Sequence, residues 1–254
     1  MARLSGVNHE DRLTLVEHLD ELRARLIVSL AVFGVALALC FWQNHMLLDI
    51  VKGPLPSNHD RLLTFGVTEP FMTTFTVAAY GAIIISLPII LFQLYAFVLP
   101  AFSEHERKVM TPLLLMVPLL FIAGVVFAYF VVLPTATKFL LNFNNDQFNV
   151  QVRARDYYSF VSTTLLAVGI IFQVPVGLLA VTRLGIITPK QLSQNRRYAY
   201  LIAAVVAAAL PGVDPVTMLI EMLPLVVLFE ASIVLCRLFG TPESGRLPEP
   251  STQE

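Results

Sequence analysis

Charged residues are scarce in this chain of 254 residues: they make up 14% of it, whereas hydrophobic residues make up 56%. A soluble domain of this size could not bury so much apolar surface in one core without exposing large apolar patches. The formal net charge is only -1, so no basic field argues for a nucleic-acid partner. The composition therefore predicts an integral membrane protein that does not bind nucleic acid.

Residues that hold metals or form covalent intermediates are also few. The chain has two cysteines and five histidines, and none of them occur at metal-ligand spacing. It lacks a nucleotide-binding loop, a catalytic triad and a zinc motif. We therefore predict no metal site and no cofactor, and we expect that the chain is not an enzyme.

Long uncharged runs, in contrast, are abundant. A membrane-spanning helix needs about 20 apolar residues, and six runs approach that length, at about 26–42, 75–98, 113–133, 160–181, 198–210 and 216–236. The fifth run would cover only about 20 Å as a helix, so we expect a short final hairpin. The sequence predicts an all-α membrane protein with one six-helix domain over 1–240 and a disordered cytoplasmic tail over 241–254.

The distribution of basic residues predicts the orientation. With the N-terminus inside, 12 of the 17 lysines and arginines lie on the cytoplasmic side and 5 lie outside. Both termini are therefore expected in the cytoplasm. The two long connections, 46–74 and 134–159, would then be external, and we expect a structured loop or a short interfacial helix in the first.

The N-terminal segment is expected to form an amphipathic helix at the membrane surface. Its apolar residues follow helical spacings of three and four: Leu13, Val16, Leu19, Leu22 and Leu26. Glu21 and Arg23 occupy the polar faces, and no charge follows from Leu26 to Phe41. This pattern predicts that the amphipathic helix runs directly into the first span.

Glu106, in the connection between the second and third spans, has two interpretations. Ser103 with Glu106 three residues later is a capping-box pattern, in which Glu106 only caps the third span. Alternatively, Glu106 faces Glu21 across the cytoplasmic surface, and each carboxylate holds one arginine of a bound peptide. Periodicity alone leaves both interpretations open.

Several segments together resemble the TatC family, the receptor subunit of the twin-arginine protein translocase. They occur in the family's order over roughly 15–239: HLDELR at 18–23, FQLYAFVLPAF at 92–102 with HERK at 105–108, FAYFVVLP at 127–134, FQVPV at 172–176, LGIITP at 184–189 and PGVDP at 211–215. The resemblance implies a curved, glove-like bundle with a short final hairpin. It also implies that Glu21, Arg23, Phe97 and Glu106 form the surface that recognises the signal peptide.

The function implied by this resemblance is that of a receptor in the cytoplasmic (inner) membrane of a prokaryote. It would bind twin-arginine signal peptides of folded proteins at its cytoplasmic face and nucleate transport driven by the proton-motive force. The implied partners are single-span TatA- and TatB-type helical subunits, further copies of this chain in a homo-oligomer, and membrane lipid.

The polar residues inside the spans depart from the family at one position. Many members carry glutamate where this chain has Gln173, whereas Glu221 lies in an otherwise apolar run of the last span. A carboxylate within the membrane is costly and suggests a function. We expect Glu221 to face Gln173, so that the carboxylate has moved from one helix to another. In the alternative, Glu221 is protonated and only hydrogen-bonds a neighbour.

Two further alternatives remain open at this point. Asp214, in the external PGVDP turn, either caps the last span or has a function of its own. The chain as a whole could instead be a secondary transporter of a small solute that uses Glu221 and Gln173 at mid-membrane. A membrane-embedded protease or transferase is disfavoured because no nucleophile and base pair is visible.

Overall fold

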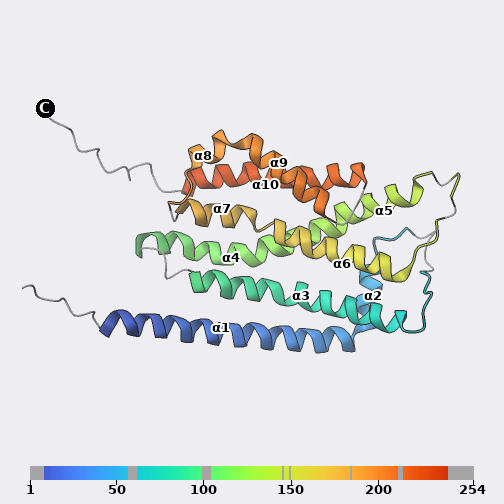
Figure 1. Ribbon diagram of the computed structural model, residues 1–254, viewed down its shortest axis with the longest axis horizontal. Coiled ribbons are helices and arrows are strands. Elements are labelled where there is room, and N and C mark those ends of the chain that lie inside the picture. Colours follow the sequence, from blue (N-terminus) through green and yellow to red (C-terminus); the bar gives the residue numbers. More distant parts are fainter. Residues whose placement is uncertain are drawn as a thin grey trace, which may run out of the picture. The chain divides into compact units, whose positions relative to one another are not determined.

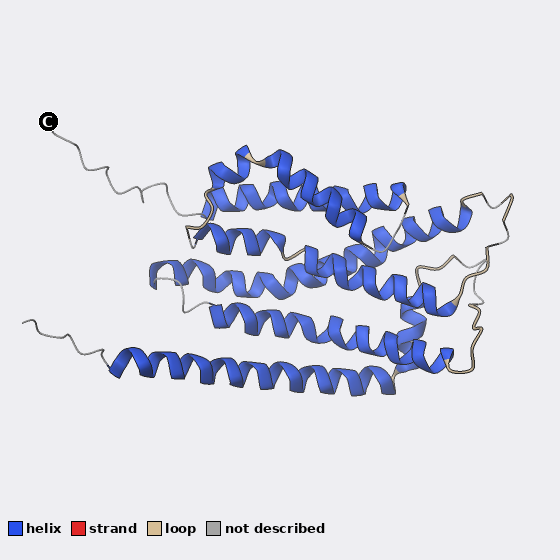
Figure 2. Ribbon diagram, viewed as in Figure 1, coloured by secondary structure: helices blue, strands red, loops and turns tan. Residues whose placement is uncertain are grey.

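Helices carry most of the described part of the chain (Figure 2). The computed structural model describes residues 9–56, 62–98, 104–144, 146–148, 150–183, 185–210 and 214–239, without the side chains of 9–17, 104–114 and 239. Within these ranges, β-structure is limited to one isolated bridge between Leu63 and Arg153. The prediction of an all-α chain is confirmed, whereas the predicted tail over 241–254 lies outside the described residues.

The chain divides into two compact units. The first comprises residues 1–119 and 151–166, and the second comprises 120–150 and 167–254. Helices α4 (Glu104–Phe127) and α6 (Ala154–Ile171) each begin in the first unit and end in the second.

The first unit is built on the pairing of α1 (His9–Trp42) with α3 (Glu69–Val98), which run side by side in Figure 1. Small buried side chains let the two helices approach closely: Ala36 and Cys40 on α1, and Ala78 and Ala82 on α3. Helix α1 continues without a break from the amphipathic segment into the first span, as the sequence predicts. The short helix α2 (Asn44–Lys52) packs against α3 and confirms that the first long connection contains a structured segment.

The two long connections meet within the first unit. The Leu63 N–H donates to the Val152 carbonyl at 2.9 Å, and the Ala154 N–H donates to the Leu63 carbonyl at 2.8 Å. Beside this backbone pairing, Arg153 Nε lies 2.8 Å from Glu69 Oε1. Residues 84 or more positions apart are therefore joined by both backbone and side-chain bonds.

In the second unit, the third span contains a π-helical segment. Helix α4 passes into η3 (Ala128–Val132), which continues as α5 (Leu133–Asn142). Pro134 follows at the start of α5, and its ring lacks an N–H and crowds the preceding turn. Local π geometry re-satisfies the backbone near such a proline inside a membrane helix.

The C-terminal part of the second unit is organised around α10. It comprises α7 (Val174–Arg183), α8 (Pro189–Gln194), α9 (Arg196–Ala209) and α10 (Pro215–Phe239), with α10 packed against α7 and α9. Glu230 on α10 accepts hydrogen bonds from two α9 side chains, Arg196 at 2.9 Å and Tyr200 at 2.6 Å. These bonds join α9 to α10 at one end of the final hairpin.

Five helices in the described part are long and apolar enough to cross a membrane: His18–Trp42, Glu69–Val98, Leu115–Asn142, Ala154–Arg183 and Pro215–Leu238. The expected fifth span corresponds to α9, which has 14 residues. At 1.5 Å per residue, α9 is about 21 Å long and shorter than the hydrocarbon layer of about 30 Å. The structure is therefore that of a multi-pass membrane protein in which α9 is shorter than the hydrocarbon layer.

Gly124 and Gly169 mark a close crossing of α4 and α6 in the second unit. A Cβ atom on Gly124 would lie 2.7 Å from Phe172 Cγ and 3.0 Å from the Gly169 backbone. We expect Gly124→Ala to lower the free energy of unfolding by about 1–3 kcal/mol because the crossing has no room for a methyl group. Denaturant unfolding of the purified protein in detergent measures this change.

Gly34 provides the matched control for this substitution. A Cβ atom there would meet nothing within 4 Å. Gly34→Ala should therefore leave stability unchanged or raise it by up to about 1 kcal/mol through helix propensity. Equal stability of the two variants would contradict the close crossing.

Candidate functional site

The end of the α1–α3 pair brings together residues that the sequence singles out for peptide recognition. Glu21 lies on α1, and Phe97 lies in the last turn of α3. The His18 ring stacks on the Phe97 ring, with centroids 4.2 Å apart and an interplanar angle of 9°. This stack holds the polar part of α1 against the end of α3.

Arg25 fixes the position of the Glu21 carboxylate. Its Nη2 and Nε donate to Glu21 Oε1 at 2.6 and 2.9 Å, and its Nη1 donates to Gln93 Oε1 on α3 at 2.7 Å. The Glu21 side chain is 36% exposed, and its Oε2 lies 3.8 Å from His18 Nδ1. A carboxylate offers about four lone-pair positions, so Glu21 is held in place with capacity for a further donor.

The structure gives less detail for the other two predicted recognition residues, Arg23 and Glu106. Arg23 lies on α1 with an exposed side chain. Glu106 belongs to α4, but its side chain lies outside the described residues. The pairing of Glu21 with Glu106, and the alternative capping role of Glu106, therefore stay predictions.

Sequence reasoning did not include Arg25 and Gln93 in this site. The spacing of Glu21 and Arg25, four residues apart on one helix, is a signal for an ion pair that could have been used. The contact with Gln93 spans 68 positions. No local pattern points to such a partner.

A second group of polar residues lies on one buried face of α10. Buried side chains recur along this face at multiples of about one helical turn: Thr217, Glu221, Leu225, Ser232 and Cys236. Glu221 is only 2% exposed, and neither carboxylate oxygen has a hydrogen-bond partner among the described residues. A buried carboxylate in this state is costly.

Gln173 lies in the same unit, at the break between α6 and α7. Its side chain is 9% exposed, so both residues of the expected intramembrane site are buried. That Gln173 and Glu221 face each other directly stays a prediction.

Asp214 lies at the start of α10. Its Oδ1 accepts hydrogen bonds from the backbone N–H groups of Val216 at 3.1 Å and Thr217 at 2.7 Å. A side-chain oxygen that accepts from the second and third helical positions has the geometry of a helix N-cap.

Comparison with known protein families decides the assignment of these features. The family described as "Sec-independent protein translocase protein (TatC)" matches residues 17–224. The chain belongs to the TatC family. It is therefore a component of a Sec-independent protein translocase that works with other Tat subunits, which confirms the resemblance and the non-enzymatic role.

TatC relatives match nearly the whole chain. The TatC protein of Carboxydothermus hydrogenoformans is 35% identical over 236 residues, which cover 92% of this chain and 97% of the relative. The TatC protein of Escherichia coli is 35% identical over 91% of this chain and 90% of its own length. This membership in a protein translocase family argues against a small-solute transporter.

Solved TatC structures share the fold. One, described as "Crystal Structure of Twin Arginine Translocase Receptor- TatC", has a TM-score of 0.75 and 36% identity, covering 87% of this chain and 99% of its own. A second, in DDM, has a TM-score of 0.76 and 37% identity, covering 86% of this chain and 98% of its own.

Proposed function

We propose that this chain is the receptor subunit that binds twin-arginine signal peptides of folded proteins and nucleates their transport by the proton-motive force. In this proposal both termini and the Glu21 end of the bundle face the cytoplasm of a prokaryote, and a glove-like bundle sits in the inner membrane. The observation that carries the proposal is the arrangement around Glu21, a fixed but accessible carboxylate beside Phe97.

The chemistry of this arrangement suits arginine better than lysine. A guanidinium donates two parallel hydrogen bonds to a carboxylate, whereas an ammonium acts as a compact point charge. Arg25 already occupies Glu21 Oε1, so an incoming arginine binds Oε2 or displaces Arg25. Glu106 would receive the second arginine, and the Phe97 ring offers a face on which a guanidinium stacks.

The test is binding of signal peptides to the full chain in lipid nanodiscs. The wild type should bind an Arg-Arg peptide more tightly than its Lys-Lys counterpart. Glu21→Gln should weaken Arg-Arg binding by roughly ten- to a hundredfold because it removes a charge-assisted hydrogen bond. Glu106→Gln should have an effect of the same order.

Asp20→Asn is the matched control, because Asp20 is the neighbouring carboxylate with an exposed side chain. This variant should keep the wild-type preference for the Arg-Arg peptide. Equal binding of both peptides by the wild type, or an unchanged preference in Glu21→Gln, would contradict the proposal.

The intramembrane polar group is proposed as the contact for partner subunits. Glu221 and Gln173 would pair with a polar residue of an incoming TatA- or TatB-type helix, since small and polar residues favour helix association in membranes. Glu221 is buried in the chain alone. Docking at Glu221 therefore requires local separation of the helices around α10.

A further inference from the structure

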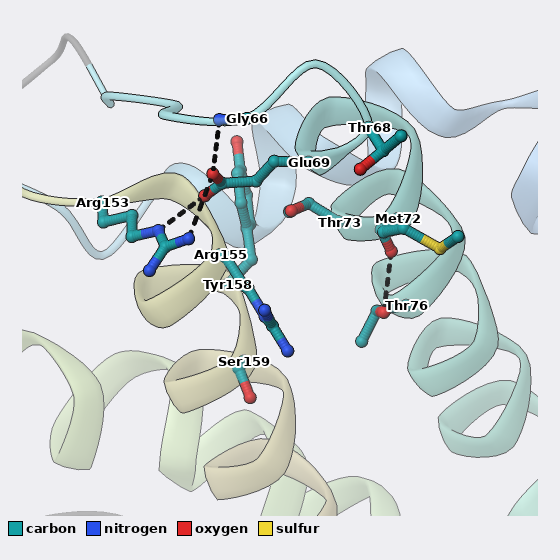
Figure 3. Close-up of a pocket in the computed structure, with 10 residues that line it drawn as sticks. All are labelled: Gly66, Thr68, Glu69, Met72, Thr73, Thr76, Arg153, Arg155, Tyr158 and Ser159. Carbon is teal, nitrogen blue, oxygen red and sulfur yellow. Dashed lines mark hydrogen bonds and ion pairs between the residues drawn. The ribbon is translucent and has the colours of Figure 1, made fainter.

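A cavity lined mainly by polar residues lies in the first unit, beside the start of α3 (Figure 3). Its volume is about 460 Å³. The lining residues used below come from the start of α3, from the start of α6 and from the residue just before α6: Glu69, Met72, Thr73, Arg153, Arg155 and Ser159.

The charged residues of the lining leave one positive charge in excess. Glu69 is neutralised by Arg153, whose Nε and Nη2 donate to its two carboxylate oxygens at 2.8 and 3.2 Å. The hydrogen bond to Glu69 raises the pKa of the Arg153 guanidinium above its ordinary value, so Arg153 stays charged. Arg155, whose side chain is exposed, adds a further guanidinium to the wall.

The buried hydroxyl of Thr73 is a second, independent indication that the cavity binds a ligand. The residue is 7% exposed, and its Oγ1 has no hydrogen-bond partner among the described residues. Figure 3 shows its hydroxyl directed toward the space between α3 and α6. A buried hydroxyl without a partner costs free energy, and an acceptor atom in the cavity would remove that cost.

We propose that this cavity binds the phosphate group of an anionic phospholipid. Arginine matches phosphate geometry with two parallel donors, and the hydroxyls of Thr73 and Ser159 supply further donors. Met72, which lines the cavity and is 57% exposed, gives the cavity an apolar border along which an acyl chain can lie. A free anion would make no use of this apolar border.

This site is separate from the proposed peptide site and lies at the other end of α3. Lipid binding there would connect the starts of α3 and α6. Each of these helix starts lies within one of the two long connections. The cavity is thus a lipid site of the translocase subunit that is independent of signal-peptide recognition.

The test uses the full chain in phosphatidylcholine nanodiscs titrated with phosphatidylglycerol. The midpoint of thermal unfolding of the wild type should rise and saturate with added phosphatidylglycerol. Arg155→Gln should weaken the apparent lipid affinity on the order of tenfold, because a charge-assisted bond is lost. Lys138→Gln, which removes an exposed cation outside the cavity, should titrate like the wild type.

Thr73→Val separates ligand binding from folding. It keeps the shape and removes the unpartnered hydroxyl, so its midpoint in pure phosphatidylcholine should not fall, whereas its response to phosphatidylglycerol should weaken. A lower midpoint in phosphatidylcholine, or identical titrations of Arg155→Gln and Lys138→Gln, would overturn the proposal. An equal shift of the wild type with inorganic phosphate alone would overturn the lipid as the source of the phosphate.

Discussion

Replacing Arg153 by alanine is expected to lower the midpoint of thermal unfolding by roughly 5 °C or more. Glu69 is 7% exposed, and the substitution would leave its carboxylate with only the backbone N–H groups of Phe65 and Gly66, at 3.0 and 3.2 Å. A buried charge that loses its partner destabilises far more than an exposed ion pair does. Thermal unfolding in lipid-free, phosphate-free detergent measures the change.

Two companion variants identify the cause of this loss. Arg155→Ala removes a guanidinium two positions along the chain that does not bond Glu69, and its midpoint should stay near the wild-type value. The double variant Glu69→Gln/Arg153→Ala should be more stable than Arg153→Ala alone, because no uncompensated charge remains. The two side chains are not coupled if the double variant loses at least as much stability as Glu69→Gln and Arg153→Ala lose together as single variants.

Glu221→Leu is expected to stabilise the isolated chain while abolishing transport. Both carboxylate oxygens are buried without a hydrogen-bond partner among the described residues. An apolar side chain of similar volume should raise the free energy of unfolding by about 1–3 kcal/mol. Unfolding in detergent and export of a twin-arginine cargo in cells lacking their own TatC measure the two effects.

The same experiment tests whether the carboxylate has moved between helices. Adding Gln173→Glu to Glu221→Leu should restore part of the transport, because it returns an acidic group to the polar site. Met222→Leu, a conservative change next to Glu221, should alter stability by less than about 1.5 kcal/mol and leave transport intact. Loss of stability in Glu221→Leu would indicate a bonding partner for Glu221.

The helices could largely be predicted because their signals are local. Uncharged runs predicted the five long apolar helices of the described part, and the amphipathic pattern before Leu26 predicted the unbroken helix α1. The start of α3 at Glu69, six residues before the predicted span, was missed because a charged residue was excluded from the apolar count. Glu69 can open the helix there because its carboxylate is neutralised by Arg153.

The features that the sequence did not predict depend on contacts between segments that are far apart in the chain. Gln93 binds Arg25 across 68 positions, and Arg153 binds Glu69 across 84. No periodicity in one segment records which polar side chain will meet another after folding. Of the proposed peptide site, Glu21 and Phe97 are predictions from the family resemblance, whereas the arginine that holds Glu21 required the structure.

The length of α3 has a consequence for how a cargo signal is found. Its 30 residues span about 45 Å, which equals the thickness of a bilayer with both headgroup layers. A helix of this length can reach both headgroup layers, and in the proposed orientation its Phe97 end would lie among lipid phosphates, where anionic lipids concentrate cationic peptides. A signal adsorbed on the membrane would reach Glu21 by sideways diffusion in a plane, so added salt would slow capture mainly by detaching cargo from the lipid surface.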